Sequence, residues 1–183
     1  FQRDALFEIA ICHEALEQYN DAITIYETLV DMEPFEPNAW FNKGVIHGKK
    51  GANRMALQCY DMATIIKPDF VNAWYNMGNT YATLGRVDES VSAYREAHRV
   101  DPTDIPVMHN LASSLEEGGK FQEAADMFTK VIDLEPQHSQ ALYGRGTCYD
   151  ALEQFEKAVT DYDAALKIEP DYADLWYAKA DAL

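Results

Sequence analysis

The chain has 183 residues, of which 48% are apolar, and its 15 basic and 31 acidic side chains give a formal net charge of −16 at pH 7. No apolar run is long enough to span a bilayer and no signal peptide is recognisable, so we expect a cytoplasmic protein with no membrane-bound part. The acidic balance argues against nucleic acid or an anionic membrane surface as the main partner.

Proline recurs at a fixed spacing along the chain. Five of the seven prolines are 34 residues apart: Pro34, Pro68, Pro102, Pro136 and Pro170. A strict period of this size predicts a repeat architecture. Aligned on these prolines, the chain is predicted to be a single array, 1–183, with repeats at 3–36, 37–70, 71–104, 105–138 and 139–172 and a partial sixth repeat at 173–183. Because the period is interrupted at both ends, we expect a fragment of a longer chain.

Side-chain size recurs with the same period. Position 4 of each repeat is large and apolar: Leu6, Trp40, Trp74, Met108, Leu142 and Trp176. Position 8 is small: Ala10, Gly44, Gly78, Ala112, Gly146 and Ala180. Position 20 is also small: Ala22, Ala56, Ser90, Ala124 and Ala158. Position 24 is aromatic: Tyr26, Tyr60, Tyr94, Phe128 and Tyr162. We predict that Trp40, Trp74, Tyr60, Tyr94 and Phe128 pack helices against each other.

Each repeat is predicted to form two helices joined by a tight turn. In the third repeat, apolar residues fall on one face of each helix at helical spacing: Trp74, Met77, Gly78, Tyr81 and Leu84, then Val87, Val91, Tyr94 and Ala97. The turn slot holds a residue suited to positive φ in repeats two to four, but glutamate in repeats one and five: Gly51, Gly85 and Gly119, against Glu17 and Glu153. The repeating proline ends the second helix, and the residue after it is the predicted cap of the next one: Asp69, Thr103 or Asp171.

The third repeat carries the motif Trp74-x-x-Met77-Gly78-x-x-Tyr81, followed by Ser90, Tyr94 and Pro102, and it resembles the tetratricopeptide repeat family. Five in-phase copies extend this resemblance over nearly the whole chain. It implies an all-α, right-handed solenoid, or superhelix, of antiparallel helix hairpins whose first helices line a concave groove. The departures are His13, His47 and Leu115 at position 11, and Lys43, Arg145 and Lys179 at position 7. We expect these basic side chains to bury their stems and keep their charges in water.

Few residues suggest chemistry. Cys12, Cys59 and Cys148 are predicted to be buried free thiols, which suits a reducing compartment. His13 and His47 should lie about one helix layer, roughly 10 Å, apart, which is too far for them to share a zinc ion. There is no H-E-x-x-H, C-x-x-C, P-loop or G-x-G-x-x-G motif. We therefore expect no catalytic residue, no metal and no cofactor.

The resemblance implies that positions 2, 5, 6 and 9 face the groove. Repeats two to four place a row of amides there: Asn38, Asn42, Asn72, Asn76, Asn79 and Asn110. An amide donates and accepts hydrogen bonds, which suits an extended peptide backbone. Flat rings at position 5 would contact ligand side chains: Phe41, Tyr75, His109 and Tyr143. Carboxylates lie further along: Asp4 and Glu8 near one end, Asp174 and Asp181 near the other, and Glu116, Glu117 and Asp150 along the second ridge.

These residues predict a non-catalytic scaffold for protein–protein interaction that binds an extended peptide or partner segment, with flanks that we expect to be basic. The paired basic residues with which some family members clamp a terminal carboxylate are absent from positions 2, 5 and 6, which argues against an acidic tail as ligand. The asparagines are also near the family consensus, so an inherited solvated surface is the alternative interpretation of the row.

Two other functions stay open at this point. The array could be a structural spacer or a self-association element that stacks end to end through Trp176 and Tyr177 at one end and Phe7 and Ile11 at the other. It could also be the substrate-recruiting arm of a larger multidomain enzyme whose catalytic domain lies outside this sequence.

Overall fold

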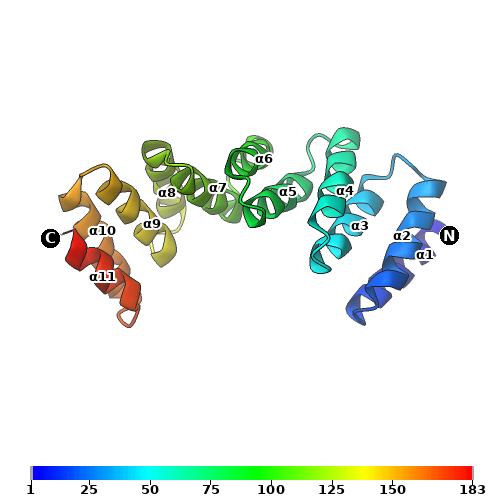
Figure 1. Ribbon diagram of the computed structural model, residues 1–183, viewed down its shortest axis with the longest axis horizontal. Coiled ribbons are helices and arrows are strands. Elements are labelled where there is room, and N and C mark those ends of the chain that lie inside the picture. The colour runs from blue at the N-terminus through cyan, green and yellow to red at the C-terminus, as the bar shows by residue number, and fades with distance from the viewer. Residues whose placement is uncertain (1, 183) are drawn as a thin grey trace. The chain divides into compact units, whose positions relative to one another are not determined.

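The computed structural model describes residues 2–182, and within that range the chain forms eleven α-helices and no β-strand (Figure 1). The helices are α1 (Gln2–Ala15), α2 (Tyr19–Met32), α3 (Pro37–Lys49), α4 (Asn53–Ile66), α5 (Val71–Thr83), α6 (Val87–Val100), α7 (Ile105–Glu117), α8 (Phe121–Leu134), α9 (Ser139–Ala151), α10 (Phe155–Ile168) and α11 (Ala173–Asp181). Each complete predicted repeat contains two of them, and α11 belongs to the partial sixth. None of the helices described is both long and apolar enough to cross a membrane.

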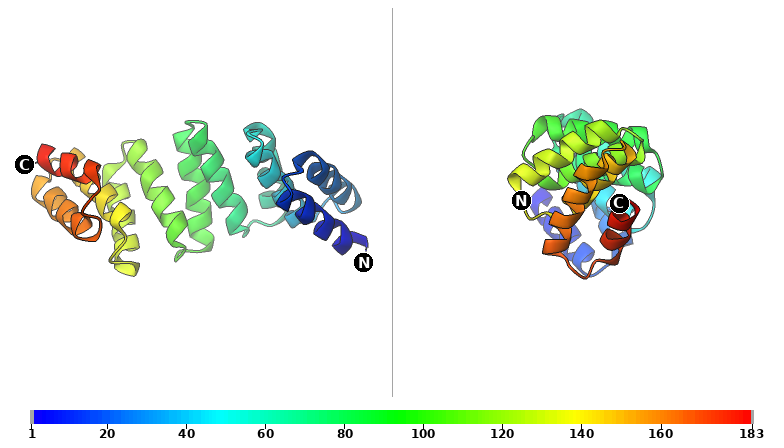
Figure 2. Two further views of the ribbon diagram at one scale, coloured as in Figure 1. Left: turned by 90° about the horizontal axis from the view of Figure 1, so that it is seen from below. Right: turned by 90° about the vertical axis from the view of Figure 1, so that its left-hand side faces the viewer.

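Residue contacts divide the chain into two compact units, Phe1–Arg86 and Val87–Leu183. Unit 1 contains α1 to α5 and unit 2 contains α6 to α11, so the division falls between the two helices of the third repeat. Within each unit every helix packs against the next one in the chain. Figure 2 shows these hairpins from two further directions. The first helices of consecutive repeats also touch, α3 with α5 in unit 1 and α7 with α9 in unit 2.

The hairpins are held by an aromatic ring packed on a small residue. All five position 24 rings are at most 3% exposed, and the position 20 residues are fully buried. A Cβ atom on Gly44 would lie 2.6 Å from the Tyr60 ring, and one on Gly146 would lie 2.5 Å from the Tyr162 ring. The close approach of helix and ring therefore explains why position 8 is small, and the predicted packing at positions 8, 20 and 24 is confirmed in the five complete repeats. In the partial sixth repeat Trp176 and Ala180 are exposed.

The tryptophans tie each first helix to the repeating proline. The indole Nε1 of Trp40 donates to the Pro34 carbonyl at 2.8 Å, that of Trp74 to Pro68 at 3.0 Å, and that of Trp176 to Pro170 at 2.9 Å. A buried or half-buried indole N–H needs such a partner. The hydrogen bond from the tryptophan indole to the carbonyl of the proline six residues earlier thus holds the loop before the first helix in place.

The turn slots have the predicted left-handed backbone. The three glycines have φ between 67° and 71°, and Glu17 and Glu153 adopt the same conformation with φ of 57° and 58°. A side chain with a Cβ is strained in this region by about 1–2 kcal/mol. Repeats one and five therefore keep the turn geometry without the residue that favours it.

The basic residues at position 7 are largely covered, as predicted, but their charges lie in ion pairs instead of water. Arg145, with a side chain 18% exposed, donates twice to Asp161 at 2.7 Å and once to Thr129. Lys43 lies 3.3 Å from Glu27, and Lys179 lies 2.6 Å from Asp163. The last two pairs occupy equivalent positions and each joins a first helix to the second helix of the preceding repeat.

Two further predictions are wrong. The caps lie one residue later than expected, at Phe70, Asp104 and Tyr172 instead of Asp69, Thr103 and Asp171. The residues after the proline first close a turn, for example with the Phe70 amide donating to the Lys67 carbonyl at 3.1 Å, and this turn delays the helix.

Cys12 is exposed, whereas Cys59 and Cys148 are buried as predicted. Cys12 and Cys148 share position 10, but α9 is covered by α7 and α8, and no helix of residues 2–182 precedes α1. Burial at this position is therefore supplied by the preceding repeat and not by the cysteine's own hairpin.

Candidate functional site

In unit 1 the predicted site residues gather on two adjacent first helices. α3 carries Asn38, Phe41 and Asn42, and α5 carries Asn72, Tyr75, Asn76 and Asn79. Residues three and four apart lie on one face of a helix, and α3 contacts α5, so this set forms one continuous surface. We call it the amide face.

The two asparagine side chains of α3 lie close to residues of the preceding repeat. The Asn38 side chain donates to Glu36 Oε1 at 2.8 Å, where Glu36 caps α3. Asn42 lies beside the hydroxyl of Tyr26, whose pKa is raised by burial to about 12. The Asn38 side chain therefore stabilises the start of α3, which supports a structural contribution to the predicted row.

The amides of α5 differ. Asn72 is exposed and Asn76 is half-buried, and neither side chain makes a hydrogen bond within the described part of the chain. They lie four residues apart on α5, about one helical turn. Together they can offer two donors and two acceptors to a backbone laid across the helix.

In unit 2 the predicted residues lie on α7 and α9, which contact each other: His109 and Asn110 on α7, Tyr143 on α9. The His109 ring stacks on His138, with centroids 5.1 Å apart and planes 20° from parallel. Burial lowers the pKa of His109, the neighbouring Asn110 amide raises it, and His138 lowers it further. His109 is therefore a neutral, stacked ring at pH 7.

Three of the position 5 rings have ring partners that were not predicted from the sequence. Phe41 lies 4.9 Å from Phe70, and Tyr143 lies 5.9 Å from Tyr172, just as His109 lies on His138. Each pair is separated by 29 residues, and the second ring caps the next first helix. The partner rings all occupy position 34 of a repeat. Position 34 is also Glu36 and Asp104 in other repeats, so no recurring residue type marks it in the sequence.

The first helices of unit 2 also carry unneutralised carboxylates: Glu116, Glu117, Asp150, Asp174 and Asp181. Among residues 2–182 none of them forms an ion pair, although Glu116 accepts a hydrogen bond from Thr147 at 2.6 Å. Burial raises the pKa of Glu116. The bases on α9 and α11, Arg145 and Lys179, are bound to the second helices instead. The first-helix face of unit 2 is therefore anionic, and we call it the acidic face.

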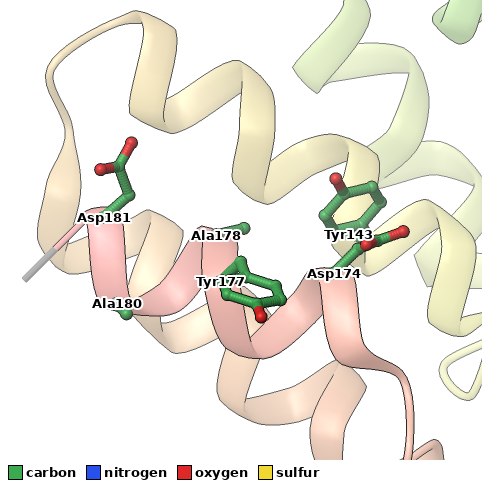
Figure 3. A pocket seen from close by; sticks show the side chains of 6 residues that line it. All are labelled: Tyr143, Asp174, Tyr177, Ala178, Ala180 and Asp181. Atoms are coloured by element: carbon green, nitrogen blue, oxygen red, sulfur yellow. The ribbon is translucent and has the colours of Figure 1, made fainter.

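Each unit has a hollow that is lined by residues of its first helices. In unit 1 a hollow of about 370 Å³ is lined by residues of α1 and α3, among them Phe7 and Asn42. In unit 2 a hollow of about 580 Å³ lies between α9 and α11 (Figure 3), and its lining is Tyr143, Asp174, Tyr177, Ala178, Ala180 and Asp181. Burial raises the pKa of Tyr143, and Tyr172, Asp174 and Glu116 act in the same direction, which places negative charge near its hydroxyl.

Features of a reaction centre are scarce. The described residues contain no group of three or more His, Cys, Asp or Glu side chains placed to hold a metal ion. Burial raises the pKa of Cys59 to about 11 and that of Cys148 to about 12, so both remain thiols at neutral pH. A protonated thiol is a poor nucleophile.

Two models of the tetratricopeptide repeat match the chain, one at residues 7–69, 109–173 and 149–183 and the other at 71–104. No curated protein sequence matches it significantly.

Among solved structures, YrrB, described as "a TPR protein with an unusual peptide-binding site", is 20% identical and has a TM-score of 0.87 over 96% of this chain and 90% of that one. A MamA protein is 16% identical, with a TM-score of 0.85 over 94% of each chain. MamA from Desulfovibrio magneticus RS-1 is 13% identical, with a TM-score of 0.83 over 93% of this chain and 97% of that one. At such identities the likeness confirms the predicted class of fold, an all-α solenoid of helix hairpins.

Proposed function

The chain belongs to the tetratricopeptide repeat family, and we propose that it is a non-catalytic protein-interaction scaffold that takes an extended segment of a partner on its first-helix faces. The observation that carries this proposal is the amide face of unit 1. There, Asn72 and Asn76 leave their hydrogen-bonding groups unpaired by residues 2–182, beside the half-buried rings of Phe41 and Tyr75.

The chemistry of this face suits a peptide backbone. An extended segment alternates N–H and C=O groups, and a side-chain amide can bind either one without regard to sequence. We assign backbone contacts first to Asn72 and Asn76, since the Asn38 side chain already donates to Glu36 of the preceding repeat and Asn42 lies beside the Tyr26 hydroxyl of that repeat. Asn79, Asn110, His109 and Tyr143 remain candidates for further contacts. The structural neighbour described as having a peptide-binding site supports the proposal by analogy of fold.

The test is the double variant Asn72→Ala, Asn76→Ala. A peptide is first selected against the wild-type chain from a random library, and its affinity is then measured by fluorescence anisotropy. We expect binding to weaken about tenfold or more, because two hydrogen bonds of roughly 1 kcal/mol each are lost.

The matched control is Gln58→Ala, Gln122→Ala, which removes two exposed amides from second helices, α4 and α8. It should bind like the wild type. Equal loss in both variants, no loss in the first, or failure to select any peptide would each contradict the proposal.

A second candidate is self-association through the array ends. Trp176 and Tyr177 are 54% and 77% exposed on α11, and Ile9 and Ile11 are exposed on α1. Large exposed apolar side chains favour association. Sedimentation equilibrium over rising concentration, with Trp176→Ser, Tyr177→Ser as the variant, tests this idea. A wild-type chain that stays monomeric throughout contradicts it.

The remaining predictions are unchanged. The cytoplasmic location, the basic flanks of the ligand and the alternative of a recruiting arm in a larger enzyme stay predictions from the sequence.

A further inference from the structure

We propose that the hollow between α9 and α11 in unit 2 binds a cationic side chain, arginine in preference to lysine, from the partner peptide. This inference rests on the proposed function, which brings a peptide to the first-helix faces, and it adds the chemical class of side chain that unit 2 selects.

The lining of the hollow combines flat rings with carboxylates (Figure 3). Tyr143 projects from α9 beside the Asp174 carboxylate of α11, and Tyr177 follows one turn further along that helix. Ala178 and Ala180 also line the hollow, and their small side chains do not fill the space beside the rings and carboxylates. At about 580 Å³ the hollow lies within the range of roughly 300–1,000 Å³ that is usual for ligand sites, so it admits one long side chain and its neighbours.

No cation of the described chain neutralises this hollow. Asp174 and Asp181 have no ion pair within residues 2–182. Lys179, the one basic residue of α11, lies 2.6 Å from Asp163 and packs over the Trp176 ring, with its Nζ atom 5.8 Å from the ring centroid. A cationic ligand can therefore pair with the exposed carboxylates of Asp174 and Asp181 without displacing a basic residue of the described chain.

The first repeat shows what complements such an arrangement. Asp4 and Phe7 occupy the same repeat positions, 2 and 5, as Asp174 and Tyr177. There the guanidinium of Arg3 pairs with Asp4 at 3.1 Å. Position 1, which is Arg3 in the first repeat, is Ala173 in the sixth. Unit 2 thus has the acid and the ring of the first repeat without its arginine.

Arginine fits this lining better than other side chains. Its planar guanidinium stacks on aromatic faces and binds carboxylates through paired N–H donors, whereas the lysine ammonium is a strongly hydrated point charge. Citrulline has nearly the same shape and no charge. The order of binding should therefore be arginine, then lysine, then citrulline.

The experiment uses three fluorescein-labelled probes of the form Gly-Ser-Xaa-Gly-Ser-Xaa-Gly-Ser, where Xaa is arginine, lysine or citrulline. Anisotropy at physiological salt measures their binding to the 183-residue chain. We expect the arginine probe to bind at least about fivefold more tightly than the citrulline probe, given a cation–π contact and an added charge pair.

Three variants should abolish this preference: Asp174→Asn with Asp181→Asn, Tyr177→Ala, and Ala173→Arg. The last supplies the internal guanidinium that the first repeat has. The control Asp126→Asn, Glu135→Gln removes two exposed carboxylates near α8 in the same unit and should keep the preference.

Equal binding of the arginine and citrulline probes, or no measurable binding of either, would overturn the proposal. So would a control variant that loses the preference as completely as Asp174→Asn, Asp181→Asn, because the effect would then be one of net charge. The selected peptide of the proposed function is measured separately against the Asn72→Ala, Asn76→Ala variant. If that variant weakens its binding while the arginine preference of the probes is absent, the scaffold function stands and the cation site alone is wrong.

Discussion

Unit 1 and unit 2 are built from one repeat, but they present different first-helix faces. Unit 1 has 7 basic and 11 acidic side chains, a net charge of −4, and its helices α3 and α5 expose amides. Unit 2 has 8 basic and 20 acidic side chains, a net charge of −12, and its helices α7, α9 and α11 expose carboxylates. Positions 20 and 24 are buried in both units, so the chemistry of the surface varies independently of this part of the core.

The largest effect should come from the tryptophan column. Trp74→Ala in unit 1 should lower the free energy of unfolding by about 3–5 kcal/mol, because it removes packing and leaves the Pro68 carbonyl without its donor. Trp176→Ala in unit 2 should cost much less, since more than half of that side chain is exposed. Urea denaturation measures both. Equal costs would contradict this ranking by burial, and an unchanged Trp74→Ala variant would contradict the packing role.

The ion pairs at position 7 should differ between the units. Asp161→Ala in unit 2 should cost about 3 kcal/mol, because Arg145 stays largely covered and loses two short hydrogen bonds. Glu27→Ala in unit 1 should cost about 1 kcal/mol or less, since Glu27 is mostly exposed and its pair with Lys43 is longer. Thermal or urea unfolding decides the matter, and a larger loss for Glu27→Ala would contradict this ranking.

The turn slots offer a gain in stability in both units. Glu153→Gly in unit 2 and Glu17→Gly in unit 1 should each stabilise the chain by about 0.5–1 kcal/mol, because glycine relieves the strain of positive φ at some cost in entropy. Gly119→Ala, which introduces that strain, should destabilise by a similar amount. A destabilised Glu153→Gly variant would mean that the glutamate side chain makes a stabilising contact in the turn.

The smallest effect is expected from pH. The folded pKa of His109 lies below the ordinary value of 6.5, mainly because of burial, so the unfolded chain takes up its proton first as the pH falls. The contribution of neutral His109 to the free energy of unfolding is therefore fully present above pH 6.5 and declines as the pH falls below it. His109→Phe should make the decline shallower, but His47 in unit 1 and His98, whose pKa values are also lowered by burial, should keep part of it. Unfolding curves between pH 5 and pH 7.5 that coincide for wild type and variant would contradict this assignment.

The sequence predicted the parts of the fold that depend on one repeat. Side-chain size at positions 8, 20 and 24 is set by the distance between the two helices of a hairpin, and the turn slot is set by local backbone geometry. Both features recur every 34 residues, so both can be predicted from the spacing of residue types along the sequence.

What was missed depends on contacts between repeats. Cys12 and Cys148 share a position but differ in burial, because a preceding repeat covers only one of them. The pairing of position 5 rings with the residue that caps the next first helix, and the hydrogen bond from Asn38 to Glu36, likewise follow from contacts with the neighbouring repeat. The predicted site residues all lie on first helices, but the sequence could not sort them into side chains with partners inside the protein and side chains without such partners.

The central claim is that a partner segment lies on the first helices. The most direct measurement is photo-crosslinking of the selected peptide, made with a benzophenone at successive positions, followed by mass spectrometric mapping of the adducts. We predict adducts on α3 and α5 in unit 1 and on α7, α9 and α11 in unit 2, near Asn72, Asn76 and Tyr143. Adducts confined to the second helices, α2, α4, α6, α8 and α10, would contradict it.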